Sequence, residues 1–383
     1  MMKGSEILKY FQQRQESVID SICEIVEMES PSGDAERSCD VAAWIEKRAA
    51  ATCIRLTIEK TFAKDSGEHI VIRAFEAAGE KSVLLLGHTD TVHPVGTKSL
   101  NPTRVEDGKL YGCGVFDMKA NVVVILEVLR FFSETNLRPA RPITILLSCD
   151  EEVGSFTGRP LVEREAAMAD YCLVLEPSSA GRVKTGRKGT GMFTLRAWGK
   201  PAHAGLEPEK GANAIREIAR QIERLDALNA PAAGTTVNIC TIKGGTTTNV
   251  IPEHAECTID VRFLLAAEAD RIENAIKNLP AFDPRVKLLV SGEVNRPPME
   301  RTPAVVSLYE RARTLAASFD YDLGETRVGG ASDGNFVAAL GVPVLDGLGI
   351  SGDGAHTLGE YIDIDDIPKR ATLLTMLLGH GVS

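Results

Sequence analysis

The sequence predicts an α/β protein in which helices sandwich a mostly parallel sheet, with a smaller α+β domain inserted into the chain. Apolar runs at residues 83–87 and 143–147 contain no polar residue and predict strands buried on both faces. Segments with helical spacing separate such runs, a pattern typical of a parallel sheet covered by helices. Within residues 187–297, the segments 192–198 and 255–262 instead alternate apolar and polar side chains, which indicates antiparallel strands with one open face.

The bulk composition is that of a globular protein with more than one domain. With 383 residues, the chain exceeds the roughly 150 residues of a typical domain, so two or three domains are expected. Apolar residues make up 44% and charged residues 25%, which is enough for a large core. The net charge of −10 excludes long-range attraction to nucleic acid or to anionic membranes.

The eight cysteines are scattered singly, and this distribution is typical of a reducing compartment. No Cys-x-x-Cys pair occurs, so neither a disulfide framework nor a thiolate zinc site is expected. The first 26 residues carry charges throughout and lack the apolar core of a signal peptide, and no run is long enough to span a membrane. We therefore predict a cytoplasmic protein.

The elements of the outer segments follow from periodicity and from helix-breaking residues. One helix is expected at 5–26, and a second helix is expected directly after Asp34, which would be its N-terminal cap. Strands are then expected at 54–60, 69–74 and 83–87. A polar hairpin lies within 93–112, followed by an apolar helix at 118–132 and strands at 143–147 and 171–175.

The inserted domain contains expected helices at 211–228 and 267–278 and a strand at 286–291. After it, helix 303–318, strand 342–345 and helix 367–378 return the chain to the first domain. The predicted boundaries are thus 1–186 and 298–383 for the main domain and 187–297 for the insert.

A histidine and an aspartate follow the first apolar run, in the order His88, Thr89, Asp90. An imidazole that binds a metal needs its second ring nitrogen held by an acceptor, and a nearby aspartate supplies one. His88 would then be a ligand and Asp90 its orienting partner. The alternative is an ordinary hydrogen-bonded turn, so this pair alone does not decide the matter.

Other potential ligands follow the same rule, because each apolar strand ends in one. A cluster of carboxylates with few nearby cations is unfavourable in a dry site unless cations from solution pair with it. Two histidines with several carboxylates suffice for two zinc ions that share a bridging carboxylate. The alternative is that the acids merely cap helices. The set comprises His88, Glu151, Glu152 and Glu176 at the ends of strands, Asp117 before a buried helix, and His356 in a glycine-rich loop.

These motifs resemble those of a known family over nearly the full length of the chain. They are GHTDTV (87–92), GCGVFDMK (112–119), DEEVGS (150–155), LEP (175–177) and AH (355–356). In this order and spacing they are similar to the co-catalytic zinc metallopeptidases, a family that includes glutamate carboxypeptidase, acetylornithine deacetylase, succinyl-diaminopimelate desuccinylase and aminoacylase. One departure is Cys113, where the family often has Arg or Pro.

The resemblance implies a role for each site residue. Two Zn²⁺ ions, with Co²⁺ or Mn²⁺ as substitutes, would share the bridging ligand Asp117. Glu151 would be the general base, Asp90 would orient His88, and the peptide bond after Asp117 would be cis. The remaining ligands would be divided into two pairs, His88 with Glu176 on one ion and Glu152 with His356 on the other.

The insert resembles the lid and dimerisation domain of that family, so a homodimer is expected. His203 would stabilise the oxyanion, reaching into the site of the partner subunit. Asn249 and Arg262 resemble positions that hold the carboxylate of the substrate, Arg296 resembles a glutamate-contacting arginine, and Gly330 belongs to a glycine-rich substrate loop. Without the resemblance, His203 is a loop histidine and Arg262 a solvated strand residue.

The expected activity is zinc-dependent hydrolysis of an amide bond in a small peptide or N-acyl amino acid with a free carboxylate. The motifs look most like the carboxypeptidase G type, which releases C-terminal glutamate. One alternative is a deacylase of the acetylornithine or succinyl-diaminopimelate type. A second alternative is a metal-dependent binding protein without catalysis, although the presence of Glu151 disfavours it.

Overall fold

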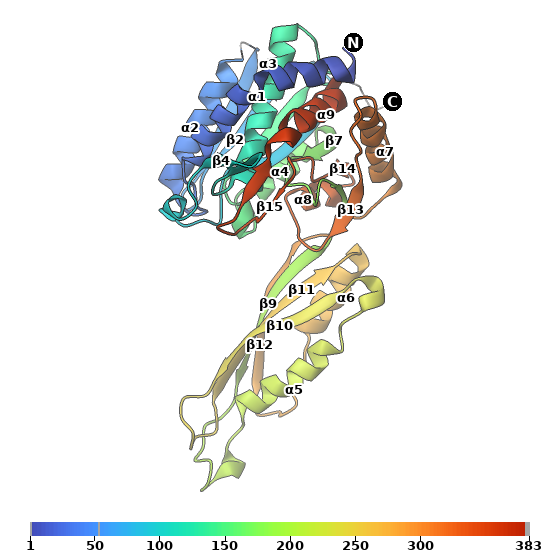
Figure 1. Ribbon diagram of the computed structural model, residues 1–383. Coiled ribbons are helices and arrows are strands. Elements are labelled where there is room, and N and C mark those ends of the chain that lie inside the picture. The colour runs from blue at the N-terminus through green and yellow to red at the C-terminus, as the bar shows by residue number, and fades with distance from the viewer. Residues whose placement is uncertain (1, 53, 380–383) are drawn as a thin grey trace. The chain divides into compact units, whose positions relative to one another are not determined.

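Two units make up the chain in the computed structural model, which describes residues 2–52 and 54–379 (Figure 1). Cys53, one of the scattered cysteines, lies outside the described residues. Unit 1 comprises the residues up to 186, together with 301–327 and those from 332 onward. Unit 2 comprises residues 187–300 and 328–331.

The main sheet of unit 1 has six strands in the order β1-β2-β6-β3-β7-β14. The pairs β3–β6, β3–β7 and β7–β14 are parallel, whereas β2 is antiparallel to both β1 and β6. Within this sheet, therefore, only β2 runs against the common direction. The strands are β1 (Leu56–Ala63), β2 (Gly67–Ala74), β3 (Ser82–His88), β6 (Ile143–Ser148), β7 (Ala169–Val174) and β14 (Val344–Leu345).

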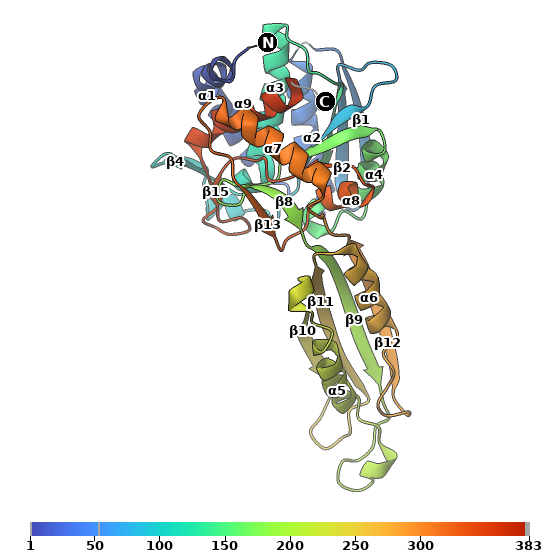
Figure 2. The same ribbon diagram turned by 90° about the vertical axis from the view of Figure 1, so that its right-hand side faces the viewer.

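Helices cover both faces of this sheet. On one face, α1, α3 and α9 pack against each other, α2 packs on β2, and α7 packs on α9 (Figure 1). On the other face, α4 contacts β6 and β7, and α8 contacts β7 and β14; Figure 2 shows α4 and α8 on the side away from α1 and α9. The helices are α1 (Gly4–Val26), α2 (Ala35–Ala50), α3 (Ala120–Thr135), α4 (Arg159–Ala166), α7 (Pro303–Ala317), α8 (Gly334–Ala339) and α9 (Ile367–Gly379).

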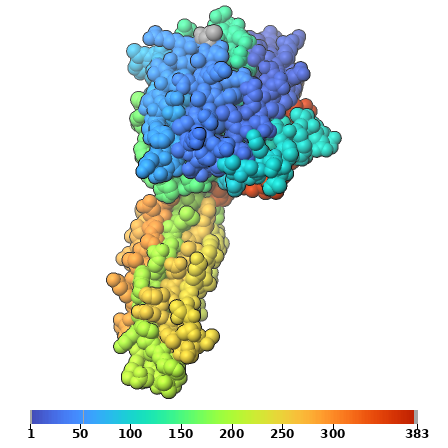
Figure 3. Space-filling view, turned by 90° about the vertical axis from the view of Figure 1, so that its left-hand side faces the viewer, coloured from blue at the N-terminus to red at the C-terminus, as the bar shows by residue number. Residues whose placement is uncertain are grey.

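Apolar spacing explains these layers. Along α1, Ile7, Phe11 and Ile22 are buried in the core, whereas polar residues such as Lys9 and Glu16 are exposed, as expected for a helix on the surface of a sheet. Residues from the beginning of the chain, in blue, form much of the face of unit 1 seen in Figure 3. Asp34 caps α2 by accepting a hydrogen bond from the backbone N–H of Arg37 at 3.2 Å.

The chain also forms two smaller sheets. One has the order β15-β16-β5-β4 and contains the predicted hairpin, which is formed by β4 and β5; the other pairs β8 with β13. Their strands are β4 (Arg104–Glu106), β5 (Lys109–Tyr111), β8 (Val183–Arg187), β13 (Glu325–Val328), β15 (Gly352–Asp353) and β16 (Tyr361–Asp363).

Unit 2 is an antiparallel sheet in the order β10-β11-β9-β12 with two helices. Phe193, Leu195 and Ile259 lie in its core with residues of both helices, whereas the intervening residues of β9 and β11 are partly exposed or exposed. One sheet face therefore remains open. The elements are β9 (Gly189–Trp198), α5 (Ala214–Asp226), β10 (Thr236–Gly244), β11 (His254–Phe263), α6 (Ala266–Lys277) and β12 (Lys287–Arg296).

The structure confirms the predicted fold class, a mostly parallel sheet between helices with an α+β insert. The short helices α4 and α8 were not predicted from the sequence, because six to eight residues are too few for a clear period. None of the helices among the described residues combines the length and the apolarity needed to cross a membrane.

Candidate metal centre

Three parallel strands bring the predicted ligands to one edge of the sheet. His88 is the last residue of β3, Glu151 and Glu152 follow β6, and Glu176 follows β7. Because β3 lies between β6 and β7 and all three run in the same direction, their carboxyl ends meet. The order and direction of these strands therefore place His88, the two glutamates after β6 and Glu176 next to one another.

His88 is buried and its two ring nitrogens face different partners. Nδ1 lies 3.0 Å from the backbone carbonyl of Asp90 and 3.4 Å from Oδ1 of the same residue. Nε2 lies 3.1 Å from Asp117 Oδ1 and 3.6 Å from Glu176 Oε1. A proton on Nδ1 is thus held by Asp90, which leaves Nε2 directed at the carboxylates as a metal-binding histidine requires.

Asp117 presents one carboxylate oxygen to each of the two histidines. Oδ1 faces His88, and Oδ2 lies 3.4 Å from His356 Nε2. His356 Nε2 also lies 3.1 Å from Glu152 Oε2. This arrangement suits a carboxylate shared between two cations, with one histidine beyond each oxygen. The peptide bond from Asp117 to Met118 is cis, which confirms the prediction.

The two histidines differ in their surroundings. The side chain of His88 is 1% exposed, whereas that of His356 is 51% exposed and belongs to a residue with φ of 66°. His356 lies between β15 and β16 and not at the end of a strand of the main sheet. The main sheet therefore fixes His88, whereas a turn outside that sheet carries His356.

The charges of the cluster shift its pKa values strongly. Burial acts to lower the pKa of His88, but hydrogen bonds to Asp117 and Asp90 and the charge of Glu176 raise it well above its usual value. Hydrogen bonds to Asp117 and Glu152 raise the pKa of His356 to about 10. Burial opposes ionisation of Asp117, yet hydrogen bonds from both histidines hold its pKa below the usual range. Without a metal, protonated rings supply the positive charge.

The donor set fits divalent metal ions of the zinc type. The possible ligand atoms of His88, Asp117 and Glu152 lie within 4.8 Å of one another, and so do those of His88, Glu151 and Glu176. Among the described residues, Glu152 Oε1 is a buried oxygen without a hydrogen-bond partner, an arrangement that costs free energy unless a cation meets it. Imidazole and carboxylate are ordinary ligands of zinc.

Asp90 has a second function that the sequence did not indicate. Its carboxylate accepts hydrogen bonds from the backbone N–H groups of Glu151 and Glu152, both at 3.2 Å, and from Ser32 Oγ at 2.6 Å. One buried aspartate therefore holds both His88 and the turn that carries the two glutamates. Spacing along the chain gives no sign of this, because the glutamates lie about 60 positions away.

The loops of unit 2 that carry His203 and Asn249 lie side by side. His203 forms a bridge with Val250, and the Ala204 N–H donates to the Asn249 carbonyl at 2.9 Å. His203 Nδ1 accepts hydrogen bonds from the N–H groups of Gly205 and Leu206, both at 3.1 Å. In the neutral ring the proton consequently resides on Nε2, so the exposed His203 can act as a hydrogen-bond donor.

The other predicted substrate residues of unit 2 are already engaged. Arg262, on the open sheet face, grips Asp260 with both arms of its guanidinium, Nε at 2.9 Å and Nη2 at 2.8 Å. Arg296 is buried at the end of β12. The carbonyl of Gly330 accepts from Arg187 Nη1 at 3.3 Å. The structure thus places the metal-site residues in unit 1 and this predicted substrate set in unit 2.

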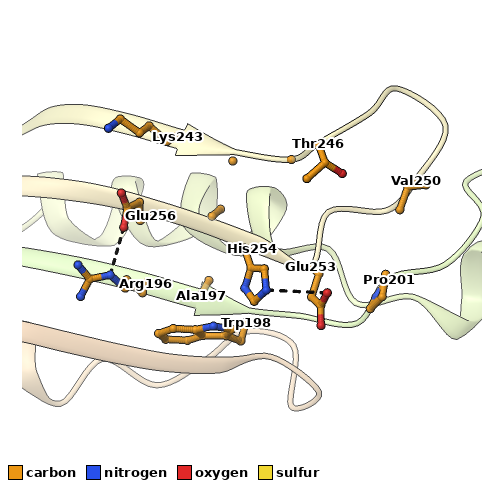
Figure 4. Close-up of a pocket in the computed structure, with 13 residues that line it drawn as sticks. Arg196, Ala197, Trp198, Pro201, Lys243, Thr246, Val250, Glu253, His254 and Glu256 are labelled. Atoms are coloured by element: carbon orange, nitrogen blue, oxygen red, sulfur yellow. Dashed lines mark hydrogen bonds and ion pairs between the residues drawn. The ribbon is translucent and has the colours of Figure 1, made fainter.

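Unit 2 also contains a hollow of about 420 Å³ on its sheet, shown in Figure 4. Its lining includes Trp198 from β9 and Lys243 from β10, and none of the predicted site residues. Two of its charged groups are paired with each other, Arg196 with Glu256 at 3.1 Å. Because it offers no cluster of convergent ligands, it does not compete with the carboxylate and histidine cluster of unit 1 as a catalytic site.

Comparison with known families and curated proteins gives consistent results. Residues 84–380 match the family described as Peptidase family M20/M25/M40. Carboxypeptidase G2 of Pseudomonas sp. (strain RS-16) is 34% identical over 380 residues, covering 96% of this chain and 90% of that protein. A succinyl-diaminopimelate desuccinylase of Psychrobacter arcticus is 28% identical over 340 residues, with 82% of each chain covered.

Solved structures share the fold at lower identity. Aminopeptidase PepT of Bacillus cereus has a TM-score of 0.77 at 23% identity and covers 95% of this chain and 98% of its own. The M20 family metallo-carboxypeptidase Sso-CP2 of Sulfolobus solfataricus has a TM-score of 0.71 at 16% identity, with 94% and 98% covered. These matches extend over both units.

Proposed function

Since the chain belongs to the peptidase family M20/M25/M40, which the sequence motifs predict, we propose that it uses two zinc ions to release a C-terminal amino acid, glutamate in particular. The protein is a metal-dependent hydrolase of this family. The number and identity of the metal ions, the role of each residue and the choice of substrate are the proposal. The observation that carries it is Asp117, whose two oxygens face one histidine each.

Five side chains would hold the metal ions, and Asp117 would serve both. His88 and Glu176 would complete one site, and His356 and Glu152 would complete the other. Co²⁺ or Mn²⁺ can replace Zn²⁺, because the same imidazole and carboxylate donors accept them. When bound, such ions acidify a water molecule and polarise the scissile carbonyl.

Glu151 is the general base of the reaction. A carboxylate oxygen of Glu151 lies within 4.8 Å of ligand atoms of His88 and Glu176. Glu151 is nevertheless not one of the proposed metal ligands, so its carboxylate can exchange a proton. It takes a proton from the attacking water and delivers the proton to the nitrogen of the leaving amine. Asp90 keeps this glutamate in place through the turn that it holds by two backbone hydrogen bonds.

His203 donates a hydrogen bond from its Nε2–H group to the oxyanion that develops on the scissile carbonyl. The acceptance of two backbone hydrogen bonds by its Nδ1 supports this role, because it leaves the proton on the other nitrogen. We place His203 in the site of a partner subunit, in a homodimer formed through unit 2. The chain is expected in the cytoplasm, with neither nucleic acid nor membrane as a partner.

The substrate is a small peptide or an N-acyl amino acid with a free carboxylate. Arg262 and Arg296 supply positive charge for that carboxylate, and Asn249 and the Gly330 loop supply polar contacts. The similarity to carboxypeptidase G2 supports glutamate as the released residue. The similarity to succinyl-diaminopimelate desuccinylase supports a deacylase as the second candidate.

A substrate panel combined with metal analysis tests these assignments. Folate and N-acylated glutamates are assayed beside N-acetylornithine and N-succinyl-diaminopimelate, with protein that contains two equivalents of Zn²⁺. We expect hydrolysis of the glutamate compounds. Hydrolysis of only the other two would replace the carboxypeptidase by the deacylase. No hydrolysis of any compound in a broad acyl-amino-acid panel would favour a binding protein.

A further inference from the structure

Glu360 is a fully buried acid, 0% exposed, whose carboxylate accepts four hydrogen bonds. Oε1 accepts from the backbone N–H groups of Phe116 and Asp117, both at 2.9 Å. Oε2 accepts from the N–H of Gly114 at 2.8 Å and lies 2.7 Å from His93 Nε2. Three of the four donors therefore belong to the segment that ends at the shared ligand Asp117.

These hydrogen bonds reach the ligand itself, because one donor is the backbone N–H of Asp117. A buried carboxylate requires such donors to compensate the loss of water, and hydrogen bonds to an ionised acceptor are short and strong. The position of the Asp117 backbone is thereby tied to the side chain of Glu360. A change at Glu360 should shift the carboxylate that faces both histidines.

Glu360 also belongs to the segment that carries another proposed ligand, the exposed His356. The turn with His356 begins after β15 and ends at β16, which starts one residue after Glu360. Strand β16 pairs with β5, and the backbone of Glu360 accepts from the Gly112 N–H at 3.4 Å. Glu360 thus fastens the His356 segment to the Asp117 segment, and these two ligands come from distant parts of the sequence.

We propose that Glu360 is a positioning residue that sets how tightly the protein binds its metal ions, by holding Asp117 and His356 at a fixed separation. The inference rests on the proposed two-metal site, although not on the substrate. A role in metal binding would distinguish Glu360 from buried acids that only stabilise the fold. Glu165 is one of these: its side chain is 0% exposed and is paired with Arg73 at 2.6 Å and Arg164 at 2.8 Å.

The test compares Glu360→Gln with Glu165→Gln in the full-length protein after removal of metal. Cobalt affinity is measured by calorimetry, and the Co²⁺ absorption spectrum reports the coordination geometry. Glu360→Gln should bind Co²⁺ about 10–100-fold more weakly with an altered spectrum, the usual effect of losing a group that orients a ligand. Glu165→Gln should lower the Tm of the metal-free protein but leave the cobalt affinity and spectrum unchanged.

Glu360→Asp retains the charge on a shorter side chain and provides a second variant. We expect a cobalt affinity between those of the wild type and Glu360→Gln, and this variant carries the test if Glu360→Gln fails to fold. Wild-type cobalt affinity and spectrum in a folded Glu360 variant would overturn the inference. The result is independent of the substrate panel, because a protein that bound cobalt but hydrolysed nothing would refute the proposed activity and not the role of Glu360.

Discussion

Most predicted site residues of unit 1 are buried and most of those of unit 2 are exposed, with His356 and Arg296 as the clear exceptions. In unit 1, His88 and Asp90 are buried and held by several hydrogen bonds at the end of a parallel strand. In unit 2, His203 and Asn249 are exposed on loops, and Arg262 lies on an open sheet face. Buried side chains that form several hydrogen bonds are held in the geometry that the chemical step requires. Exposed side chains can change conformation to fit a ligand or a second subunit.

This contrast leads to a distinction between two kinds of variant. Changes in unit 1 should reduce turnover or metal binding with every substrate alike, because the reacting atoms are common to all of them. Changes in unit 2 should depend on the substrate or on the partner subunit. The expected effects below run from the largest to the smallest.

Glu151→Gln in unit 1 should have the largest effect. A glutamine cannot accept a proton, so kcat should fall by about 10²–10⁴-fold, the contribution of a positioned general base. Metal content should stay at the wild-type value, because Glu151 is not one of the proposed ligands. Steady-state kinetics with two different substrates and metal analysis check both statements. Near-normal turnover would assign the proton transfer to another group, while Glu165→Gln serves as a control for the loss of a buried acid.

His203→Asn in unit 2 should lower kcat by about 10²–10³-fold, as expected for loss of one donor to an oxyanion. Asparagine can still accept hydrogen bonds near the position of Nδ1 but lacks the Nε2 donor. The readout is kcat together with the dimer content from sedimentation, which should not change. An unchanged kcat would remove His203 from the reaction and leave it as a loop residue.

Mixing the two inactive variants shows whether His203 acts across the dimer. If Glu151→Gln and His203→Asn proteins exchange subunits, each mixed dimer contains one site with both residues intact. Random exchange should restore about a quarter of the wild-type activity, since half of the dimers are mixed and each has one working site. No recovery after demonstrated exchange would place His203 and Glu151 of the same chain in one site.

Metal binding should weaken as the pH falls, because protons and metal ions compete for the histidines of unit 1. Hydrogen bonds to Asp117 and Glu152 raise the pKa of His356 to about 10, and the pKa of His88 is also raised. Both rings are therefore protonated in the metal-free protein at neutral pH, and raising the pH favours the metal. The ion at His356 should bind about tenfold more weakly per pH unit below its pKa of about 10, and the ion at His88 should weaken in the same direction.

Calorimetry in buffers with different ionisation enthalpies measures the protons released. Loading both ions at neutral pH should release about two protons, one from each histidine. His356→Gln should release about one. A wild-type protein that released no protons would show that its histidines are neutral before the metal binds. Units 1 and 2 would then differ in the burial of their site residues and not in the charge of their histidines.

The fold and the ligand cluster were both predictable from the apolar runs in the sequence, because these runs mark the strands that carry the ligands. Continuous apolar runs predict parallel strands, and the carboxyl ends of neighbouring parallel strands meet, so His88 and Glu176 are adjacent once the strands are recognised. Helix boundaries are less predictable: the helix expected from residue 118 begins at Ala120, because Asp117 and Met118 have non-helical backbone angles.

The supporting hydrogen bonds were not predictable, because they join residues that are remote in sequence and bear no periodic signal. Glu360 bonds to Asp117 across 243 positions, and Asp90 bonds to Glu151 across 61. The pairing of Arg262 with Asp260 is different. Residues two apart on a strand share a face, so this pair could have been expected from the alternation of the strand.

Arg262→Lys in unit 2 should have the smallest effect. Lysine cannot form the two parallel hydrogen bonds of a guanidinium, and losing one charge-assisted bond, about 1.5 kcal/mol, should raise KM roughly tenfold for substrates with a free carboxylate. The Tm should hardly change, because exposed ion pairs contribute only about 0–1 kcal/mol to the free energy of unfolding. Steady-state kinetics and thermal unfolding measure the two quantities.

Arg196→Lys is the matched control for this last prediction. Arg196 lies on β9, next to β11, and pairs with Glu256 at 3.1 Å on the same open face as Arg262. Its side chain is 40% exposed, close to the 35% of Arg262. Equal KM values for the two variants would mean that the Arg262 guanidinium remains with Asp260 during the reaction. A higher KM for Arg262→Lys alone would mean that the substrate carboxylate competes with Asp260 for it.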